Sequence, residues 1–303
     1  MDKKIVVFLP DLSKIMPDQI KIIECPRDAM QGIKDFISTE EKVHYIQSLL
    51  RVGFDTIDFG SFVSPKAIPQ MVDTAEVLAQ LDLSKTKSKL LAIVANTRGA
   101  MDASQYNEID YLGYPFSISE NFQMRNTHKT IAQSVVTLQE ILDIASKSNK
   151  EVVAYLSMGF GNPYGDPWNV EIVGEWTERL SKMGVKILSL SDTIGSSNPE
   201  NIDYLFSNLI PKYPEIEFGA HLHTTPTTWF EKVNAAFLAG CKRFDGAIQG
   251  FGGCPMAKDE LTGNMPTEKL LSYFTSKKSV NNLNALSFES AYNEASKIFT
   301  KYH

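Results

Sequence analysis

Short runs of apolar and β-branched residues recur along the chain. Between most of them lie longer stretches in which apolar residues return every three or four positions, the pattern of a helix that buries one face. We therefore expect strands at Ile20–Cys25, Thr56–Phe59, Leu90–Ala95, Ile109–Gly113, Glu151–Ser157, Val185–Leu190, Ile216–His221 and Cys241–Ala247. Helical patterns cover Glu40–Val52, Thr127–Lys147, Asn169–Met183 and Thr227–Ala239. Strands that alternate with such helices form a parallel sheet.

Signals for the ends of helices agree with this interpretation. Ser38 and Glu41 have the spacing of a capping box. Gly53, Gly184 and Gly240 each stand where a helix should end before the next strand. Eight strand and helix units of roughly 30 residues favour a closed (β/α)8 TIM barrel. An open doubly wound sheet is the alternative, and its dinucleotide-binding form is weakened because no GxGxxG turn follows the first strand.

One TIM-barrel domain can account for the whole chain of 303 residues. We expect the barrel to cover about residues 18–277 and a C-terminal helical cap to cover about 280–303, where Phe288–Tyr302 has a helical pattern. Near the N-terminus, a short apolar run is closed by Pro10 and Asp11, which makes it too short for the core of a signal peptide. We interpret it as an extra strand in a cytoplasmic protein.

The composition, 43% hydrophobic and 22% charged, is typical of a folded soluble protein. A net charge of -6 without clustered Lys or Arg argues against nucleic acid or an anionic membrane as a partner. Cys25, Cys241 and Cys254 have no CxxC spacing, so neither a disulfide framework nor a thiolate zinc site is indicated. Cys241 is interpreted as core filling, whereas Cys25 can be either structural or functional.

Polar residues follow or end four of the predicted strands. They are Arg27 and Asp28 after the first, Asp58 at the end of the second, Asp192 after the sixth, and His221 with His223 at the end of the seventh. The carboxyl ends of all strands meet at one face of a TIM barrel, where active sites lie. We therefore expect these side chains to converge.

The His221-x-His223 pair has the spacing of a strand, so both rings should point to one side. With a carboxylate from Asp28 and an amide oxygen from Asn264, they can form a metal site with nitrogen and oxygen ligands. Such a set suits Mg2+ or Mn2+, with Zn2+ or Co2+ as substitutes. The alternative is a pair of edge histidines that only make hydrogen bonds.

A glycine-rich segment, Gly250-Phe251-Gly252-Gly253-Cys254-Pro255, follows the last strand. Three glycines in four positions allow a loop to fold closely over a ligand and to move as a lid. A cysteine in such a loop near a metal has a tunable reactivity. The alternative for Cys254 is a small buried residue in a tight turn.

Five segments, in this order and spacing, resemble the 3-hydroxy-3-methylglutaryl-CoA lyases along nearly the whole chain. They are IIECPRDAMQ, DFGSFVSPKAIPQM, LSLSDTIG, GAHLHTT and GFGGCP followed by TGNMPTE. The resemblance implies a divalent-metal-dependent carbon–carbon lyase that cleaves 3-hydroxy-3-methylglutaryl-CoA to acetoacetate and acetyl-CoA. An acyl-CoA would then be the partner, and a homodimer is expected by analogy.

The resemblance also implies roles for individual residues. Arg27 would neutralise the thioester enolate oxygen, and Cys254 would deliver a proton to the enolate. His221 and Asp192 would help to move the hydroxyl proton. Asp58, which stands where the family commonly has a glutamate, is also expected among the catalytic residues. Substrate contacts are expected at Arg27, Gln31, Gly252 and Gly253, and metal contacts at Asp28, His221, His223 and Asn264.

The chain departs from the family pattern at three places. Ala29 replaces the glycine of Arg-Asp-Gly, Asp58 is one methylene shorter than glutamate, and the chain ends at His303 without the basic segment that helps to hold CoA. These departures leave open a related lyase or aldolase for another 3-hydroxy-acyl thioester or hydroxy acid. A third hypothesis is a scaffold that binds metal or CoA without turnover.

Overall fold

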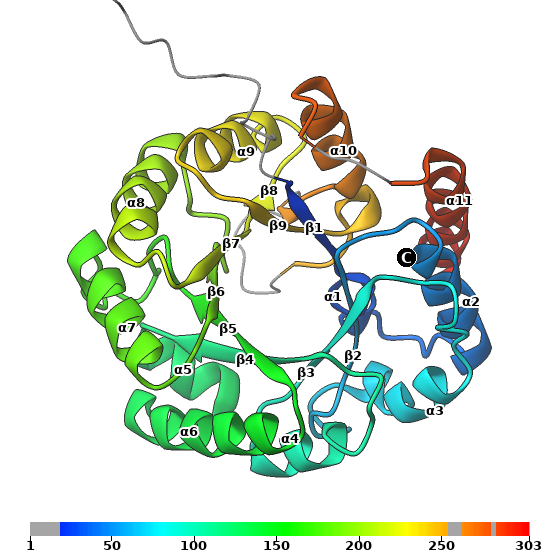
Figure 1. Ribbon diagram of the computed structural model, residues 1–303, viewed down its shortest axis with the longest axis horizontal. Helices are drawn as coiled ribbons and strands as arrows, with labels where there is room; N and C mark the ends of the chain where they lie inside the picture. Colours follow the sequence, from blue (N-terminus) through cyan, green and yellow to red (C-terminus); the bar gives the residue numbers. More distant parts are fainter. Residues whose placement is uncertain (1–18, 254–261, 280–282, 303) are drawn as a thin grey trace, which may run out of the picture.

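The computed structural model describes residues 19–253, 262–279 and 283–302. Within them, eight parallel strands close into a barrel, which Figure 1 shows end on. The barrel strands are β1 (Lys21–Glu24), β2 (Thr56–Ser61), β3 (Lys89–Ile93), β4 (Tyr111–Ser117), β5 (Glu151–Ser157), β6 (Ile187–Ser191), β7 (Glu217–His221) and β9 (Arg243–Gly246). The barrel closes because β1 pairs with both β2 and β9. The TIM barrel is thus confirmed, and the open sheet is wrong.

The helices alternate with the strands, and most of them surround the barrel on the outside (Figure 1). They are α1 (Pro26–Gln31), α2 (Thr39–Leu50), α3 (Thr74–Ala79), α4 (Thr97–Ala103), α5 (Glu120–Thr127), α6 (Ile131–Lys147), α7 (Val170–Lys182), α8 (Pro199–Lys212), α9 (Trp229–Leu238), α10 (Thr267–Ser276) and α11 (Ala285–Tyr302). Two short 3-10 turns are η2 (Pro69–Met71) and η3 (Ile248–Gly250). A small antiparallel pair, β8 (His223–Thr224) with β10 (Gly263–Asn264), lies outside the barrel sheet.

The local signals of the sequence are confirmed where they concern helix ends. Ser38 and Glu41 form a complete capping box at the start of α2. Gly53, Gly184 and Gly240 have φ angles of 91°, 106° and 98°, a backbone conformation that favours glycine.

One predicted helix is wrong in its extent. The stretch Thr127–Lys147 is divided, because α5 ends at Thr127 and α6 begins at Ile131. His128 between them adopts a left-handed conformation with φ 55°, which ends the first helix. Thr130 then caps the second helix with its side chain. The sequence pattern is continuous across this turn because both helices bury one face.

The C-terminal helix α11 packs against α2 on the outside of the barrel (Figure 1). Tyr45 of α2 meets Phe299 of α11 edge to face with ring centres 6.3 Å apart. Lys301 forms an ion pair of 2.7 Å with Glu41 near the start of α2. The expected N-terminal strand lies outside the described residues.

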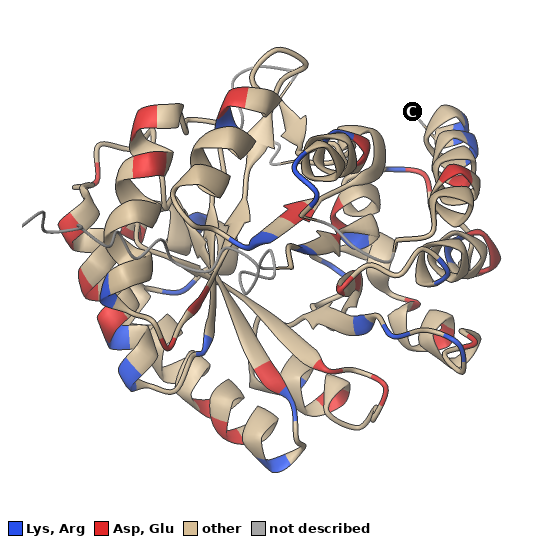
Figure 2. Ribbon diagram, turned by 45° about the horizontal axis from the view of Figure 1, so that its top comes forward, with Lys and Arg blue, Asp and Glu red and all other residues tan. Residues whose placement is uncertain are grey.

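The charged residues of the outer helices are mixed in sign rather than separated (Figure 2). Among the helices that the structure describes, none has both the length and the apolar character needed to cross a membrane.

Candidate metal centre and active-site cavity

The first helix after β1 carries three of the candidate site residues. Pro26 occupies its first turn, where the missing N–H costs no hydrogen bond, and so favours a helix start directly after the strand. Arg27, Asp28 and Gln31 on this helix all line a cavity of about 350 Å³ at the carboxyl ends of the strands. The sequence had placed the first two correctly, but it gave no sign of the helix.

Asp28, His221 and His223 come together as the sequence predicts. Their potential ligand atoms lie within 4.8 Å of one another. His221 is the last residue of β7, and His223 begins β8 two positions later. The ring centres of the two histidines are 5.5 Å apart. The strand spacing therefore brings both rings to one place beside Asp28.

The charge states of Asp28 and His223 suit a divalent cation. Burial alone would raise the pKa of the Asp28 carboxyl, but Arg27 and His221 outweigh it and lower the pKa to about 2. Burial, with a smaller contribution from His221, lowers the pKa of His223 to about 4. His223 Nδ1 is buried and has no hydrogen-bond partner within the described residues. An ionised carboxylate and a neutral imidazole are the forms that bind metals.

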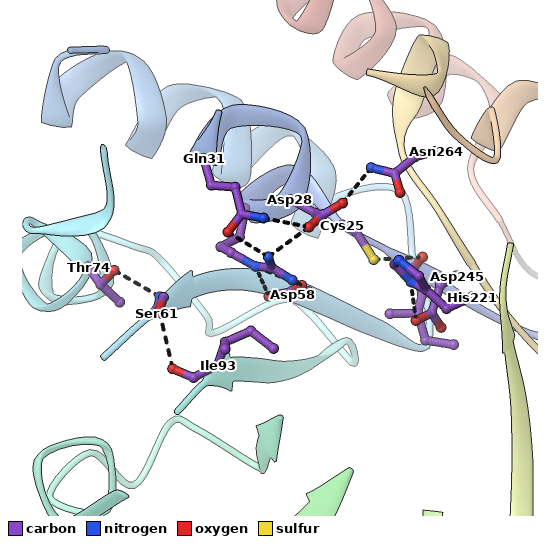
Figure 3. Close-up of polar contacts among 12 residues, drawn as sticks. Cys25, Asp28, Gln31, Asp58, Ser61, Thr74, Ile93, His221, Asp245 and Asn264 are labelled. Atoms are coloured by element: carbon purple, nitrogen blue, oxygen red, sulfur yellow. Dashed lines mark hydrogen bonds and ion pairs between the residues drawn. The ribbon is translucent and has the colours of Figure 1, made fainter. Parts of the chain in front are cut away.

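Asp245 on β9 orients His221, and sequence reasoning missed it. Its Oδ2 lies 3.1 Å from His221 Nδ1, which leaves Nε2 of the same ring for a ligand (Figure 3). Burial disfavours a charge on His221, but the hydrogen bond to Asp245 and the negative charges of Asp245 and Asp28 together outweigh burial and raise the pKa of the ring. A carboxylate behind a ligating histidine is a common means of fixing the ring and its tautomer.

Asn264 joins the cluster in an orientation that differs from the expectation. β10 pairs with β8 so that Asn264 stands opposite His223. Its Nδ2 donates to Asp28 Oδ2 over 2.7 Å (Figure 3). The same nitrogen donates to the carbonyl of Phe251 over 2.8 Å. The amide nitrogen, and not the oxygen, thus faces Asp28. A ligand role for Asn264 requires the amide to turn over and stays a prediction.

Arg27 is buried and held from three sides. Its Nε donates to both carboxylate oxygens of Asp58, at 3.1 and 3.0 Å, and Nη2 also contacts Asp58. Nη1 donates to Asp28 Oδ1 over 2.8 Å and to Gln31 Oε1 over 3.0 Å (Figure 3). Gln31 in turn donates to Asp28 Oδ1 over 2.9 Å. These contacts fix the guanidinium beside the candidate metal ligands.

Asp58 lies within β2 rather than at its end. Burial raises the pKa of its carboxyl to about 6, and Arg27 opposes this rise. Asp58 is not among the described residues that line the cavity. Its contacts assign it to holding Arg27 in place.

Asp192 follows β6 as expected but is also absent from the cavity lining that the described residues form. Its carboxylate accepts from the backbone and hydroxyl of Ser197 and pairs with Lys232 at 2.9 Å. Lys232 Nζ also donates to the carbonyl of His223 over 2.8 Å. Asp192 is thus part of a buried support behind His223, which the sequence alone did not reveal.

The glycine-rich segment is described as far as Gly253, which lines the cavity. Gly252 packs closely on α1, since a Cβ there would lie 2.6 Å from the carbonyl oxygen of Asp28 and 2.9 Å from Cα of Ala29. A side chain at this position would therefore push the segment away from the site. Cys254 lies outside the described residues.

The cavity lining has an apolar part and a polar part. Val63, Ala67 and Ile68 after β2, with Ile93 and Ala95 around the end of β3, contribute apolar atoms. Polar side chains come from α1, which packs beside β2, and from α5, β5, β6 and β7. A ligand can therefore place a polar group at the cluster and an apolar group against the β2 and β3 side.

Comparisons with known proteins agree with this geometry. The HMGL-like family model matches residues 19–293. A hydroxymethylglutaryl-CoA lyase of Bacillus subtilis is 34% identical over 84% of this chain and 85% of its own length. A Pseudomonas aeruginosa protein named 3-hydroxy-3-isohexenylglutaryl-CoA/hydroxymethylglutaryl-CoA lyase is 30% identical over 84% of this chain and 85% of its own length.

Solved structures show the same similarity. The HMG-CoA lyase of Brucella melitensis superposes with a TM-score of 0.86 at 27% identity, covering 93% of this chain and 99% of that one. An HMG-CoA lyase from Acinetobacter baumannii, in complex with coenzyme A and 3-methylmalate, superposes with a TM-score of 0.83 at 29% identity. The match covers 91% of this chain and 90% of that one. The family match and these relatives together show that the chain belongs to the HMGL-like family.

Proposed function

We propose that this protein is a divalent-metal-dependent carbon–carbon lyase that cleaves 3-hydroxy-3-methylglutaryl-CoA to acetoacetate and acetyl-CoA. The observation that carries the proposal is the convergence of Asp28, His221 and His223 beside Arg27 on one cavity. Family membership and relatives named hydroxymethylglutaryl-CoA lyase support the same reaction.

Asp28, His221 and His223 would hold the cation, with Asn264 as the fourth ligand after its amide turns. Oxygen and imidazole ligands without a thiolate suit Mg2+ or Mn2+, and Zn2+ or Co2+ can substitute. When bound, such a cation polarises the substrate oxygens and lowers the proton affinity of the tertiary hydroxyl.

Arg27 would stabilise the negative charge that develops on the thioester oxygen as the carbon–carbon bond breaks. Within the described residues, the contacts of Arg27 leave one N–H of Nη2 without a partner. Asp58 holds the guanidinium in place before the reaction, so little reorganisation accompanies the change in charge. A donor fixed in advance in this way contributes on the order of 100- to 1000-fold to the rate.

Two proton transfers complete the reaction. The hydroxyl of the substrate must lose a proton, and His221 lies beside the place where that hydroxyl would be bound. The enolate carbon must gain a proton, for which Cys254 remains the proposed donor from the resemblance. The contacts of Asp192 with Lys232 and Ser197 favour a supporting role over direct proton transfer.

A second candidate substrate is a 3-hydroxyglutaryl-CoA with a larger apolar branch at C3. The apolar side of the cavity, formed by Val63, Ala67 and Ile68, favours it. One relative carries both a methyl and an isohexenyl substrate in its name. The larger branch would pack against this side while the hydroxyl stays at the metal ligands.

Release of acetyl-CoA from a panel of acyl-CoAs tests these proposals. Purified protein is incubated with Mg2+ or Mn2+ and each thioester, and acetyl-CoA is measured with time. Turnover of the methylglutaryl thioester that depends on the cation is the expected result. Turnover of only a thioester with a larger apolar branch at C3 would favour the second candidate. No turnover of any thioester would favour a scaffold that binds without catalysis. A cytoplasmic location and a homodimer stay predictions.

A further inference from the structure

The pairing of four strands places one layer of residues inside the barrel. Tyr155 on β5 pairs with Ser189 on β6, which pairs with Gly219 on β7, which pairs with Arg243 on β9. Paired residues of parallel strands point to the same face of a sheet. This face is the interior, because Tyr155 lines the active-site cavity.

The next layer toward the carboxyl ends belongs to the site itself. Two positions further along the same strands stand Ser157, Ser191, His221 and Asp245, which point inward for the same reason. The first three of them line the cavity, and Asp245 binds His221. Arg243 therefore stands one inward-facing position before Asp245 on β9, in the floor of the barrel beneath the candidate metal centre.

Arg243 is fully buried in this floor but only partly paired. Its Nη1 lies 3.3 Å from Glu217 Oε1 at the start of β7 and 3.9 Å from Asp55 Oδ1 just before β2. Within the described residues, Nε and Nη2 have no hydrogen-bond partner, and neither do the hydroxyls of Tyr155 and Ser189 or Oδ1 of Asp245. Buried polar atoms are rarely left unpaired, because each one costs its desolvation energy. Unpaired donors and acceptors therefore occur in the same small region.

The backbone makes room for this arginine. A Cβ on Gly219 would lie 3.1 Å from Ser189 Oγ and 3.2 Å from Arg243 Cδ, so glycine leaves the space that the arginine stem uses. Burial opposes the charge of Arg243, but the nearby carboxylates, with Asp245 foremost, outweigh it and raise the pKa of the guanidinium. The charge is thus held in the interior between its ion pairs with Glu217 and Asp55 and the nearby carboxylate of Asp245.

We propose that Arg243 is a positioning residue for the metal centre, which holds the Asp245 carboxylate against His221 through water that also bonds to Ser189 and Tyr155. The inference rests on the proposed function only in treating His221 as a metal ligand. An apolar residue would fill a barrel layer at lower cost, as Val153 and Ile187 do in this interior. The proposed role of Arg243 in holding Asp245 against His221 explains why an arginine occupies this buried position.

The test is the affinity of the whole protein for Mn2+, measured by electron paramagnetic resonance without substrate. Arg243→Met keeps the stem and removes the charge and the donors. We expect its Mn2+ affinity to fall by roughly 10-fold, the scale on which partners of ligating residues act, and Arg243→Lys to recover part of the loss. Glu217→Gln is the matched control, because it weakens an ion pair of Arg243 at the start of β7 and leaves Asp245 unchanged.

The outcomes separate a positioning role from a structural one. Arg243→Met with wild-type Mn2+ affinity overturns the proposal, and so does an equal loss of affinity in Glu217→Gln. If Arg243→Met does not fold, a crystal structure of the wild-type protein with Mn2+ decides. Water that joins Arg243 to Asp245 Oδ1 supports the proposal, and a dry gap between them refutes it. Failure of the lyase reaction would show in the acyl-CoA panel and leaves this measurement unaffected.

Discussion

The two sides of the barrel sheet are built on different principles. Outside, the strands and helices share one extensive apolar core, in which residues such as Leu138, Ile202 and Phe206 are fully buried. Inside, the apolar cluster is small, and the remainder is made of polar and charged side chains such as Arg243, Asp245 and Ser189. The same strands thus supply an apolar layer on one face and a polar centre on the other.

This difference separates stability from chemistry. Burial of apolar area on the outside is the main source of folding free energy. Buried charges inside are costly unless they are well paired, and they persist here around the candidate metal centre. Substitutions on the two faces should therefore change different measured quantities.

Arg27→Lys should have the largest effect, and it should fall on catalysis. Lysine cannot reproduce the forked contacts with Asp58 and Asp28. We expect kcat to fall by roughly 1000-fold, or about 4 kcal/mol in activation free energy, with little change in Mn2+ affinity. Steady-state kinetics measure kcat, and Mn2+ titration measures the affinity for the cation. Arg51→Lys, on the exposed end of α2, is the control, and near-normal turnover of Arg27→Lys would refute the role of Arg27.

Leu138→Ala on α6 should act on the other face of the sheet. Leu138 is fully buried in the outer core, and its removal leaves a cavity there. We expect the free energy of unfolding to fall by about 3 kcal/mol, while kcat of the folded protein stays unchanged. Urea denaturation and kinetics at low temperature check this. Val136→Ala, at an exposed position on the same helix, is the control. A large loss of kcat in Leu138→Ala would contradict the prediction that the outer face affects stability and not catalysis.

Glu24→Gln should change how stability depends on pH. Burial raises the pKa of Glu24 on β1 to about 8, against the opposing hydrogen bonds from Thr267 and the backbone of Ile248. The unfolded chain ionises this carboxyl near pH 4.5, so the folded state holds an extra proton between there and pH 8. Stability is therefore full below about pH 4.5 and is lost as the pH rises toward 8.

Glutamine cannot ionise, so between pH 5 and 8 the variant should lose on the order of 3 kcal/mol less stability than the wild type. Chemical denaturation at a series of pH values measures this difference. Glu151→Gln, at an exposed position that begins β5, should follow the wild-type curve. Parallel curves for Glu24→Gln and the wild type would contradict the prediction.

Gly240→Ala should have the smallest effect. Gly240 has a φ of 98° at the end of α9, and the nearest side-chain atom to an added Cβ would be 3.6 Å away on Ile210. Space is available, so only the backbone conformation is penalised, by about 1 kcal/mol. Thermal unfolding measures the change. An unchanged melting temperature would show that the turn relaxes without cost.

The sequence predicted the fold well because its signals are local. Strand and helix periods, together with glycines such as Gly53 and Gly184, reflect each segment's own burial and backbone angles. The division at His128 was missed because the apolar pattern continues across the turn. β4 was predicted to end at Gly113 but continues to Ser117.

The site was predicted only in part because much of it depends on pairing between distant strands. Asp28, His221 and His223 could be found from their place at strand ends. Asp245 could not, because its role depends on the register of β9 beside β7. Asp192 was also expected at the site because it follows a strand, but the sequence does not show that its side chain faces Lys232 and not the cavity. Cys254 lies outside the described residues, and its role stays a prediction.

The bond between Asp28 and Asn264 joins residues 236 positions apart in the chain. During synthesis, the carboxylate emerges from the ribosome long before the segment that completes its surroundings. Contacts of such long range form late, because the intervening chain must be ordered first. A nascent or truncated chain would therefore lack an assembled centre, so neither premature metal capture nor cleavage of the thioester is expected until the last strand has docked.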